Sequence, residues 1–215
     1  MYGKGRGVPQ DYAETVKWYR LAAEQGFEIA QYELGLMYDH GEGVPQDYAE
    51  AVKWYRLAAE RGFALGQIGL HYADNLGHGV SQDCFVSEKW IKLAVQNDRY
   101  KSSGETEHIL GNFYDLGCPF NENRDLVEAV KWYRLASEQG NKHSQWVLAN
   151  KYKEGMGILQ DHISAHMWFN IASANGYLDG AFGRNEIEKK MSPSDISEAR
   201  RRAKVCMNSN YQDCD

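Results

Sequence analysis

Histidines and cysteines are the residues of this 215-residue chain whose types and spacing bear most directly on chemistry. His162 and His166 lie four residues apart in a segment of helical periodicity. This spacing places two imidazoles on one helix face, where they can share a metal ion. No third ligand follows at helical spacing, and the sequence has no H-E-x-x-H motif. We therefore predict no metal site and no cofactor.

Motifs for nucleophilic catalysis and for phosphate binding are also missing from the sequence. It contains no G-x-S-x-G motif, no P-loop and no dinucleotide-binding fingerprint, and its Gly-x-Gly pairs recur at regular intervals as turn residues. We predict that the chain has no catalytic residues and is not an enzyme.

The four cysteines form no C-x-x-C pair, which argues against zinc-finger and thioredoxin chemistry. Cys206 and Cys214 enclose a short segment near the end of the chain, and a loop of this length can close a disulfide that fastens the terminus. Cys84 takes the place that Tyr48 holds in a neighbouring repeat, so we predict a small packing residue there. Cys118, in a predicted loop, is the better candidate for a reactive thiol.

The composition is that of an ordered chain with a substantial core, at 43% hydrophobic and 25% charged residues. The net charge is -6, and acidic and basic residues are interspersed, so no basic surface for nucleic acid or anionic lipid is predicted. No apolar run approaches the roughly 18 residues that span a bilayer, and residues 1–7 lack the apolar core of a signal peptide. We expect neither nucleic-acid binding nor membrane insertion.

A tryptophan-centred motif recurs along the chain and indicates its architecture. The motif is KWYRLA or a close variant, at intervals of 36, 36, 42 and 36 residues, and its tryptophans are Trp18, Trp54, Trp90, Trp132 and Trp168. A second motif, Val-Pro-Gln-Asp-Tyr, precedes the first two copies, and variants of it precede the third and fifth. A fixed period of this length is typical of stacked structural repeats.

Each repeat has the pattern of two helices joined by a turn. In residues 47–61 the apolar residues follow helical spacing over a wide face, Asp47 is a suitable N-cap, and Gly62 ends the helix. Residues 30–40 predict a shorter helix, in which Gly35 lets bulky side chains of the partner helix approach closely. Each repeat is therefore predicted to be a helical hairpin.

One hairpin cannot bury its own apolar face, so neighbouring hairpins must stack into an all-α solenoid. The first repeat lacks its first helix, because residues 1–27 match residues 37–63. Apolar faces near Trp18 and Leu21 are then left uncovered, which predicts end-to-end self-association through this incomplete N-terminal repeat. In the third repeat we expect a shortened first helix, with the turn lengthened through residues 75–76.

The C-terminal segment departs from the repeat pattern. Ser192 has the character of an N-cap and Pro193 that of a first helical residue, which predicts a final helix from Pro193 to Met207 that caps the solenoid. Its polar face carries three arginines at 200–202. We interpret them as a solvated face rather than a phosphate site, because no second basic cluster accompanies them.

The repeat pattern resembles the Sel-one-like repeat family, a relative of the tetratricopeptide repeat. The resemblance rests on Ala-x-Tyr-x-Leu-Gly-x-x-Tyr-x-x-Gly-x-Gly-Val-x-x-Asp, followed by Ala-x-x-Trp-x-x-x-Ala-Ala-x-x-Gly. It implies a right-handed α/α solenoid of stacked helical hairpins with a C-terminal capping helix. The repeats are expected over 1–183, with a half repeat at 1–27 and whole repeats at about 28–63, 64–97, 98–140 and 141–176. The capping helix and tail are expected at 184–215.

The resemblance also implies a function, that of a non-catalytic scaffold or adaptor that binds a protein partner on its concave surface. The alternative is an immunity or inhibitor protein that neutralises a specific bacterial toxin, as some bacterial relatives do. An adaptor is expected to bind with moderate affinity, whereas an immunity protein binds one toxin very tightly. Exported relatives often end in a cysteine pair around Asn-Tyr, so the pair at the end of this chain favours a periplasmic or secreted location over a cytoplasmic one. A signal peptide, which this chain lacks, would lie upstream.

The candidate contact residues lie on the first helix of each hairpin, which the resemblance places on the concave side, at positions that vary between repeats. The predicted partner-binding residues are Glu33, Met37, Asn112, Trp146, Asn150 and Lys151. Trp146 is the only tryptophan outside the repeated motif, and as a partial anchor it would concentrate binding energy. Packing of Trp146 in the manner of Tyr32 remains the other interpretation.

Overall fold

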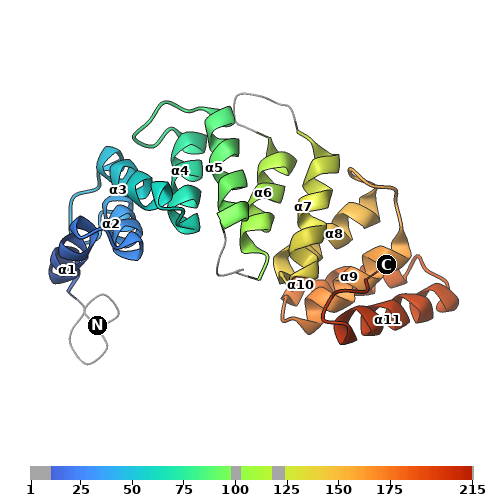
Figure 1. Ribbon diagram of the computed structural model, residues 1–215. Helices are drawn as coiled ribbons and strands as arrows, with labels where there is room; N and C mark the ends of the chain where they lie inside the picture. Colours follow the sequence, from blue (N-terminus) through green and yellow to red (C-terminus); the bar gives the residue numbers. More distant parts are fainter. Residues whose placement is uncertain (1–10, 98–102, 118–123, 215) are drawn as a thin grey trace. The chain divides into compact units, whose positions relative to one another are not determined.

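The computed structural model describes residues 11–97, 103–117 and 124–214. Within these ranges every regular element is a helix, which confirms the predicted all-α class. The chain forms two compact units, Met1–Tyr100 (unit 1) and Lys101–Asp215 (unit 2), and each is built of successive helical hairpins (Figure 1).

Unit 1 contains five helices within its described residues. They are α1 Tyr12–Glu24, α2 Glu28–His40, α3 Tyr48–Glu60, α4 Ala64–Leu76 and α5 Cys84–Asn97. Helices α2 and α4 are the first helices of their hairpins, and α1, α3 and α5 are second helices. Each helix packs against the next along the chain, and the two first helices also touch one another.

Unit 2 contains six helices within its described residues. They are α6 Glu105–Leu116, α7 Leu126–Glu138, α8 Lys142–Glu154, α9 His162–Ala174, α10 Leu178–Glu188 and α11 Pro193–Asn208. Helices α6, α8 and α10 are first helices, and α7 and α9 are second helices. Helix α11 packs on α9 and ends one residue beyond the range predicted for the final helix. The expected end of the repeats at residue 183 falls inside α10.

Aspartate caps begin all five second helices of the described residues, at Asp11, Asp47, Asp83, Asp125 and Asp161. The Asp47 carboxylate accepts a hydrogen bond from the backbone N–H of Glu50 at 3.0 Å, which confirms the predicted cap. The backbone N–H of Asp47 donates to the Tyr38 carbonyl at 2.9 Å and closes the turn between the two helices. The predicted glycine end of this helix is also confirmed, because Gly62 has φ +78°.

Helix α4 is as long as α2, so the expectation of a shortened first helix in the third repeat is wrong. Both helices have 13 residues. Gly77, with φ 72°, ends α4 in the left-handed conformation in which Gly41, with φ 74°, ends α2. The expected longer turn through residues 75–76 is therefore the last turn of α4.

A close contact between Gly35 and Tyr55 sets the distance between α2 and α3. A Cβ atom on Gly35 would lie 2.6 Å from ring carbons of Tyr55. No larger residue fits there without moving the ring, so the predicted close approach is confirmed. Gly111 and Tyr133 repeat this contact in unit 2, where the corresponding distance is 2.8 Å.

Buried glutamine side chains link a second helix to the following first helix. In each case the side-chain amide donates to a backbone carbonyl eight residues earlier in the sequence. The pairs are Gln31 with Ala23 (3.1 Å), Gln67 with Ala59 (3.3 Å) and Gln145 with Ser137 (3.1 Å). We call these three bonds the glutamine links.

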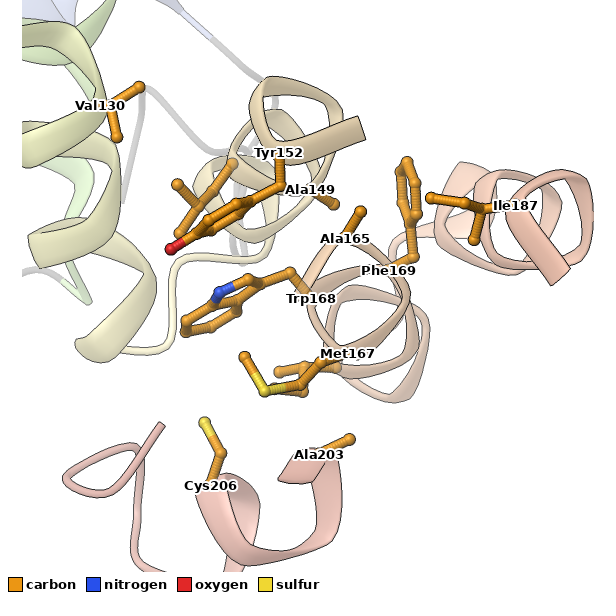
Figure 2. Packing of buried hydrophobic residues seen from close by; sticks show 12 residues of the cluster. Val130, Ala149, Tyr152, Ala165, Met167, Trp168, Phe169, Ile187, Ala203 and Cys206 are labelled. Atoms are coloured by element: carbon orange, nitrogen blue, oxygen red, sulfur yellow. The ribbon is translucent and has the colours of Figure 1, made fainter. Parts of the chain in front are cut away.

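The largest cluster of buried side chains surrounds α9 in unit 2. Figure 2 shows Trp168 facing Tyr152 of α8, Phe169 lying beside Ile187 of α10, and Met167 reaching towards α11. Trp168 is 1% exposed. Because α9 is apolar on several faces, it packs against α8, α10 and α11 at once.

Unit 1 has two smaller clusters, one around Tyr55 and Leu70 and one around Leu34 and Met37. Trp18 and Leu21 on α1 are 57% and 52% exposed. The self-association predicted for this face stays a prediction.

Cys206 and Cys214 form a disulfide, which fastens the C-terminal tail to the end of α11 as the sequence predicts. The hydroxyl of Tyr211, inside this loop, donates to the side-chain oxygen of Asn175 at 3.0 Å. Cys84 is also disulfide-bonded, so the prediction of a simple packing residue at that position is wrong. Cys118, the predicted reactive thiol, lies outside the described residues.

Candidate partner-binding site

A groove of about 410 Å³ opens in unit 1 between the first helices α2 and α4, with α3 forming its back. Its apolar lining includes Leu36, Val52, Ile68 and Ala73. The volume lies within the range of roughly 300–1,000 Å³ that is usual for small-ligand sites. Polar and aromatic side chains also line the groove.

Asp39 is at the centre of the polar contacts in this groove. The Tyr55 hydroxyl donates to the Asp39 carboxylate at 3.3 Å. The Gln46 amide donates to the Asp39 backbone carbonyl at 2.7 Å and to the Tyr48 hydroxyl at 3.1 Å. The Tyr48 ring in turn stacks on His78, with 4.1 Å between ring centroids. These contacts hold the wall of the groove in place without closing it.

The electrostatics of the groove are set by this carboxylate. Burial, followed by the nearby charge of Asp39, raises the pKa of Tyr55, so its hydroxyl stays protonated and keeps donating. In the part of the chain that the structure describes, no lysine or arginine lies within 4.0 Å of the Asp39 carboxylate. The nearest imidazole nitrogen is His40 Nε2, at 4.0 Å. The groove therefore offers a negative charge beside apolar side chains.

Apolar side chains extend the site over the first helices of unit 1. Tyr72 and Leu76, which line the groove, are 45% and 53% exposed. Ile29 on α2 and Leu65 on α4 are also about half exposed. Side chains of this size left open to solvent on neighbouring helices are a common mark of a binding surface.

The first helices of unit 2 carry an aromatic row. The Trp146 ring lies 5.5 Å from that of Tyr177, and Tyr177 lies 5.2 Å from the His143 ring, measured between centroids. Trp146 is half-buried against the α9 cluster, and Tyr32 is half-buried against the cluster around Tyr55 and Leu70. Packing within the unit therefore covers part of the Trp146 side chain. Phe182, at the repeat position of Trp146 on α10, is 70% exposed.

Two of the predicted contact residues are buried and offer almost no surface to a partner. Met37 is 5% exposed and belongs to the cluster around Leu34. Lys151 is 4% exposed, and its ammonium lies 2.6 Å from the carboxylate of Asp115. Both positions face neighbouring helices, so their variation between repeats reflects packing rather than recognition.

The other predicted residues are half-buried on first helices, Glu33 in unit 1 and Asn112, Trp146 and Asn150 in unit 2. The structure brings Asn112 close to the buried ion pair of unit 2, because the Tyr133 hydroxyl donates both to Asn112 at 2.8 Å and to Asp115 at 3.2 Å.

Asn150 is held within α8, where its amide donates to the Trp146 carbonyl at 3.0 Å. Sequence reasoning missed Asp39, Tyr72, Leu76 and Phe182. Alignment of Phe182 with Trp146 in the repeat is the signal that identifies it.

His166, one of the two histidines at metal-ligand spacing, contacts a carboxylate of α10. It is fully buried, and its Nε2 lies 2.8 Å from the Glu188 carboxylate, which Arg200 also contacts at 2.9 Å. Burial lowers the pKa of His166, although Glu188 opposes the shift. Over the described ranges no group of three His, Cys, Asp or Glu side chains is arranged to hold a metal ion. Every helix found there is also too short or too polar to cross a bilayer.

Successive helical hairpins, each packed on the next within its unit, define a helical-repeat protein. The chain belongs to the Sel1 repeat family, whose model matches residues 1–27, 29–63, 109–141 and 142–177. Proteins of this family are helical scaffolds, generally non-enzymatic, and generally mediate protein–protein interaction.

Solved structures with this fold include a protective antigen with an SLR fold from uropathogenic Escherichia coli strains. It is 32% identical with a TM-score of 0.78, over 97% of this chain and 44% of that one. A Sel1 repeat protein from Oxalobacter formigenes is 30% identical with a TM-score of 0.73, over 93% of this chain and 78% of that one. An exopolysaccharide production negative regulator of Rhizobium leguminosarum bv. viciae is 33% identical over 70 residues, 33% of this chain and 26% of that protein. The chain thus spans about a quarter of that regulator and less than half of the antigen.

Proposed function

We propose that this protein is a non-catalytic adaptor that binds a protein partner across the surface of its first helices. The observation that carries the proposal is the groove of unit 1 together with the half-exposed Tyr72 and Leu76 beside it. Such exposed apolar area is costly in water and is covered when a partner binds.

An adaptor role is favoured over that of a toxin-neutralising immunity protein. The match of a third of this chain to an exopolysaccharide production negative regulator supports a regulatory role. The two roles differ in affinity, because an immunity protein must hold a single toxin very tightly and abolish its activity.

Partner capture with matched variants tests the proposal. The wild-type chain is compared with a Tyr72→Ser, Leu76→Ser variant, which changes the first-helix surface. The control is a Leu57→Ser, Phe85→Ser variant, which changes exposed apolar residues on the second helices α3 and α5. We expect wild type and control to recover the same protein and the first-helix variant to lose it.

Equal recovery by all three chains, or no enriched protein with the wild type, contradicts the proposal. The affinity of the purified partner then separates the two roles. A dissociation constant in the picomolar range, together with loss of a toxic activity of the partner, would show that the protein is an immunity protein and not an adaptor.

A further inference from the structure

The same tyrosine–aspartate pair occurs in both units of the chain. In unit 1 the Tyr55 hydroxyl of α3 donates to Asp39 of α2 at 3.3 Å. In unit 2 the Tyr133 hydroxyl of α7 donates to Asp115 of α6 at 3.2 Å. Each pair lies between a first helix and its second helix, so the two sites are equivalent positions of the repeat.

In unit 2 a lysine from the next first helix completes this site. Lys151 of α8 places its ammonium 2.6 Å from an Asp115 carboxylate oxygen, and its side chain is only 4% exposed. The four-carbon stem is therefore packed inside the unit, while the charge meets its counter-ion. Asp115 is 14% exposed in this arrangement.

In unit 1 the corresponding lysine is missing. Ala73 stands four residues before the helix-ending Gly77, as Lys151 stands four residues before Gly155. Eight residues before the same glycines, unit 1 has Gly69 where unit 2 has Val147. Both Gly69 and Ala73 line the groove beside Asp39. The groove is thus the space that larger side chains occupy in unit 2, and the Asp39 side chain is 28% exposed, twice the value for Asp115.

We propose that the groove of unit 1 binds a lysine side chain presented by the protein partner, in the role that Lys151 fills within unit 2. This inference rests on the proposed function, because it specifies the chemistry of the partner at the same surface. The lysine enters between α2 and α4 and ends at the Asp39 carboxylate.

The lining of the groove fits each part of a lysine side chain. Leu36 and Ile68 offer apolar surface to the stem, and the Asp39 carboxylate offers a charged acceptor to the ammonium. The Tyr48 ring, fixed by its stack on His78, presents a further aromatic wall, and aromatic faces attract cations. The net charge of -6 of the whole chain favours the approach of a basic segment.

An uncharged side chain of the same length is a poorer occupant. It fills the apolar part of the groove but displaces water from Asp39 without supplying a donor, and a carboxylate that loses its hydration unpaired is costly. The groove therefore discriminates lysine from its uncharged analogue norleucine, which gives the proposal a direct test.

The test is a nuclear magnetic resonance titration of the full chain, labelled with nitrogen-15. The probes are an acetylated and amidated Ala-Lys-Ala tripeptide and the matching Ala-norleucine-Ala tripeptide. We expect the lysine peptide to give saturable shift changes at amides around Asp39 and Ala73. The norleucine peptide is expected to bind about tenfold more weakly, because the loss of one hydrogen bond to a charged group lowers the affinity by about this factor.

Two variants locate the site and one variant serves as the control. Asp39→Asn removes the charge and is expected to weaken lysine binding about tenfold while leaving norleucine binding unchanged. Ala73→Lys rebuilds the arrangement of unit 2 and is expected to abolish the shifts with both peptides. Glu28→Gln removes an exposed carboxylate from the first turn of the same helix, outside the groove, and is expected to bind as the wild type does. Unperturbed resonances of α1 and α5, which belong to the same unit but do not line the groove, report that unit 1 of each variant is folded.

Equal binding of both peptides, or full lysine binding by Asp39→Asn, overturns the proposal. Absence of saturable shifts near the groove also overturns it. Partner capture separates such a failure from a failure of the proposed function. If Tyr72→Ser, Leu76→Ser loses the partner while Asp39→Asn and Ala73→Lys retain it, the first-helix surface binds the partner without a lysine in the groove.

Discussion

Exchange of Lys151 for methionine removes the cation from a buried ion pair while keeping the volume of the side chain nearly constant. The Asp115 carboxylate then retains the Tyr133 hydroxyl at 3.2 Å and Arg124, whose guanidinium lies 3.4 Å away. Removal of one partner from a fully buried pair costs about 3–5 kcal/mol. Because Asp115 is 14% exposed and keeps Arg124, we expect a loss of about 2–3 kcal/mol.

Urea unfolding followed by circular dichroism measures this loss, and amide hydrogen exchange in α6–α8 assigns it to unit 2. A thermal scan is expected to show a midpoint about 4–12 °C lower, since each kcal/mol shifts a chain of this size by about 2–4 °C. Lys131→Met is the matched control, because Lys131 pairs with Glu128 at 2.7 Å on the surface of α7. Its unfolding transition is expected to stay close to that of the wild type.

The double variant Lys151→Met, Asp115→Asn decides the cause. It removes both charges, so it is expected to recover most of the lost stability, to within about 1 kcal/mol of the wild type. If the double variant is as unstable as Lys151→Met alone, then packing of the lysine stem, and not its pairing with Asp115, stabilises unit 2. That outcome refutes the electrostatic reasoning.

Three further predictions follow from burial and covalent structure. Trp168→Ala is expected to lower the unfolding free energy by about 3–5 kcal/mol, and the same change at the exposed Trp18 by much less, in urea titrations. Joint exchange of Cys206 and Cys214 for serine is expected to cost about 2–3 kcal/mol in the same assay, since the disulfide joins residues eight apart. Burial lowers the pKa of His71 from its ordinary value of 6.5, so the unfolded chain binds that proton more tightly. Stability is therefore expected to be complete above about pH 6.5 and to fall as the pH drops towards the lowered pKa. The slope between pH 7 and pH 5.5 is expected to flatten in His71→Gln, and an unchanged slope would contradict this assignment.

Local chemistry made much of the fold predictable from the sequence. Asp47 caps its helix because its short side chain reaches the backbone N–H groups of the first turn. Gly62 ends the same helix because it adopts positive φ without strain. The Cys206–Cys214 pairing follows from a short loop. Each of these features depends on residues close in sequence, where spacing alone carries the information.

The contact surface was harder to predict, because it depends on residues one repeat apart. Variation at the Met37 and Lys151 positions predicts contact with a partner. In the structure Lys151 is matched by Asp115, 36 residues earlier, so the variation is compensated within the chain. The same comparison identifies Asp39, because Ala73, which takes the repeat position of Lys151 in unit 1, carries no charge. Alignment of repeats reveals such a difference only after it is known which positions face one another.

The glutamine links restrict where the chain tolerates a change of length. Each joins residues eight apart and includes the short connection between a second helix and the next first helix. One added residue in this connection would move the glutamine side-chain amide out of reach of the backbone carbonyl. Both buried polar groups would then lack a hydrogen-bond partner. The turns from a first helix to its own second helix lie outside these links. Insertions during the evolution of such repeats are therefore expected in those turns, which lets a partner-specific loop grow while the stacking of the hairpins stays constant.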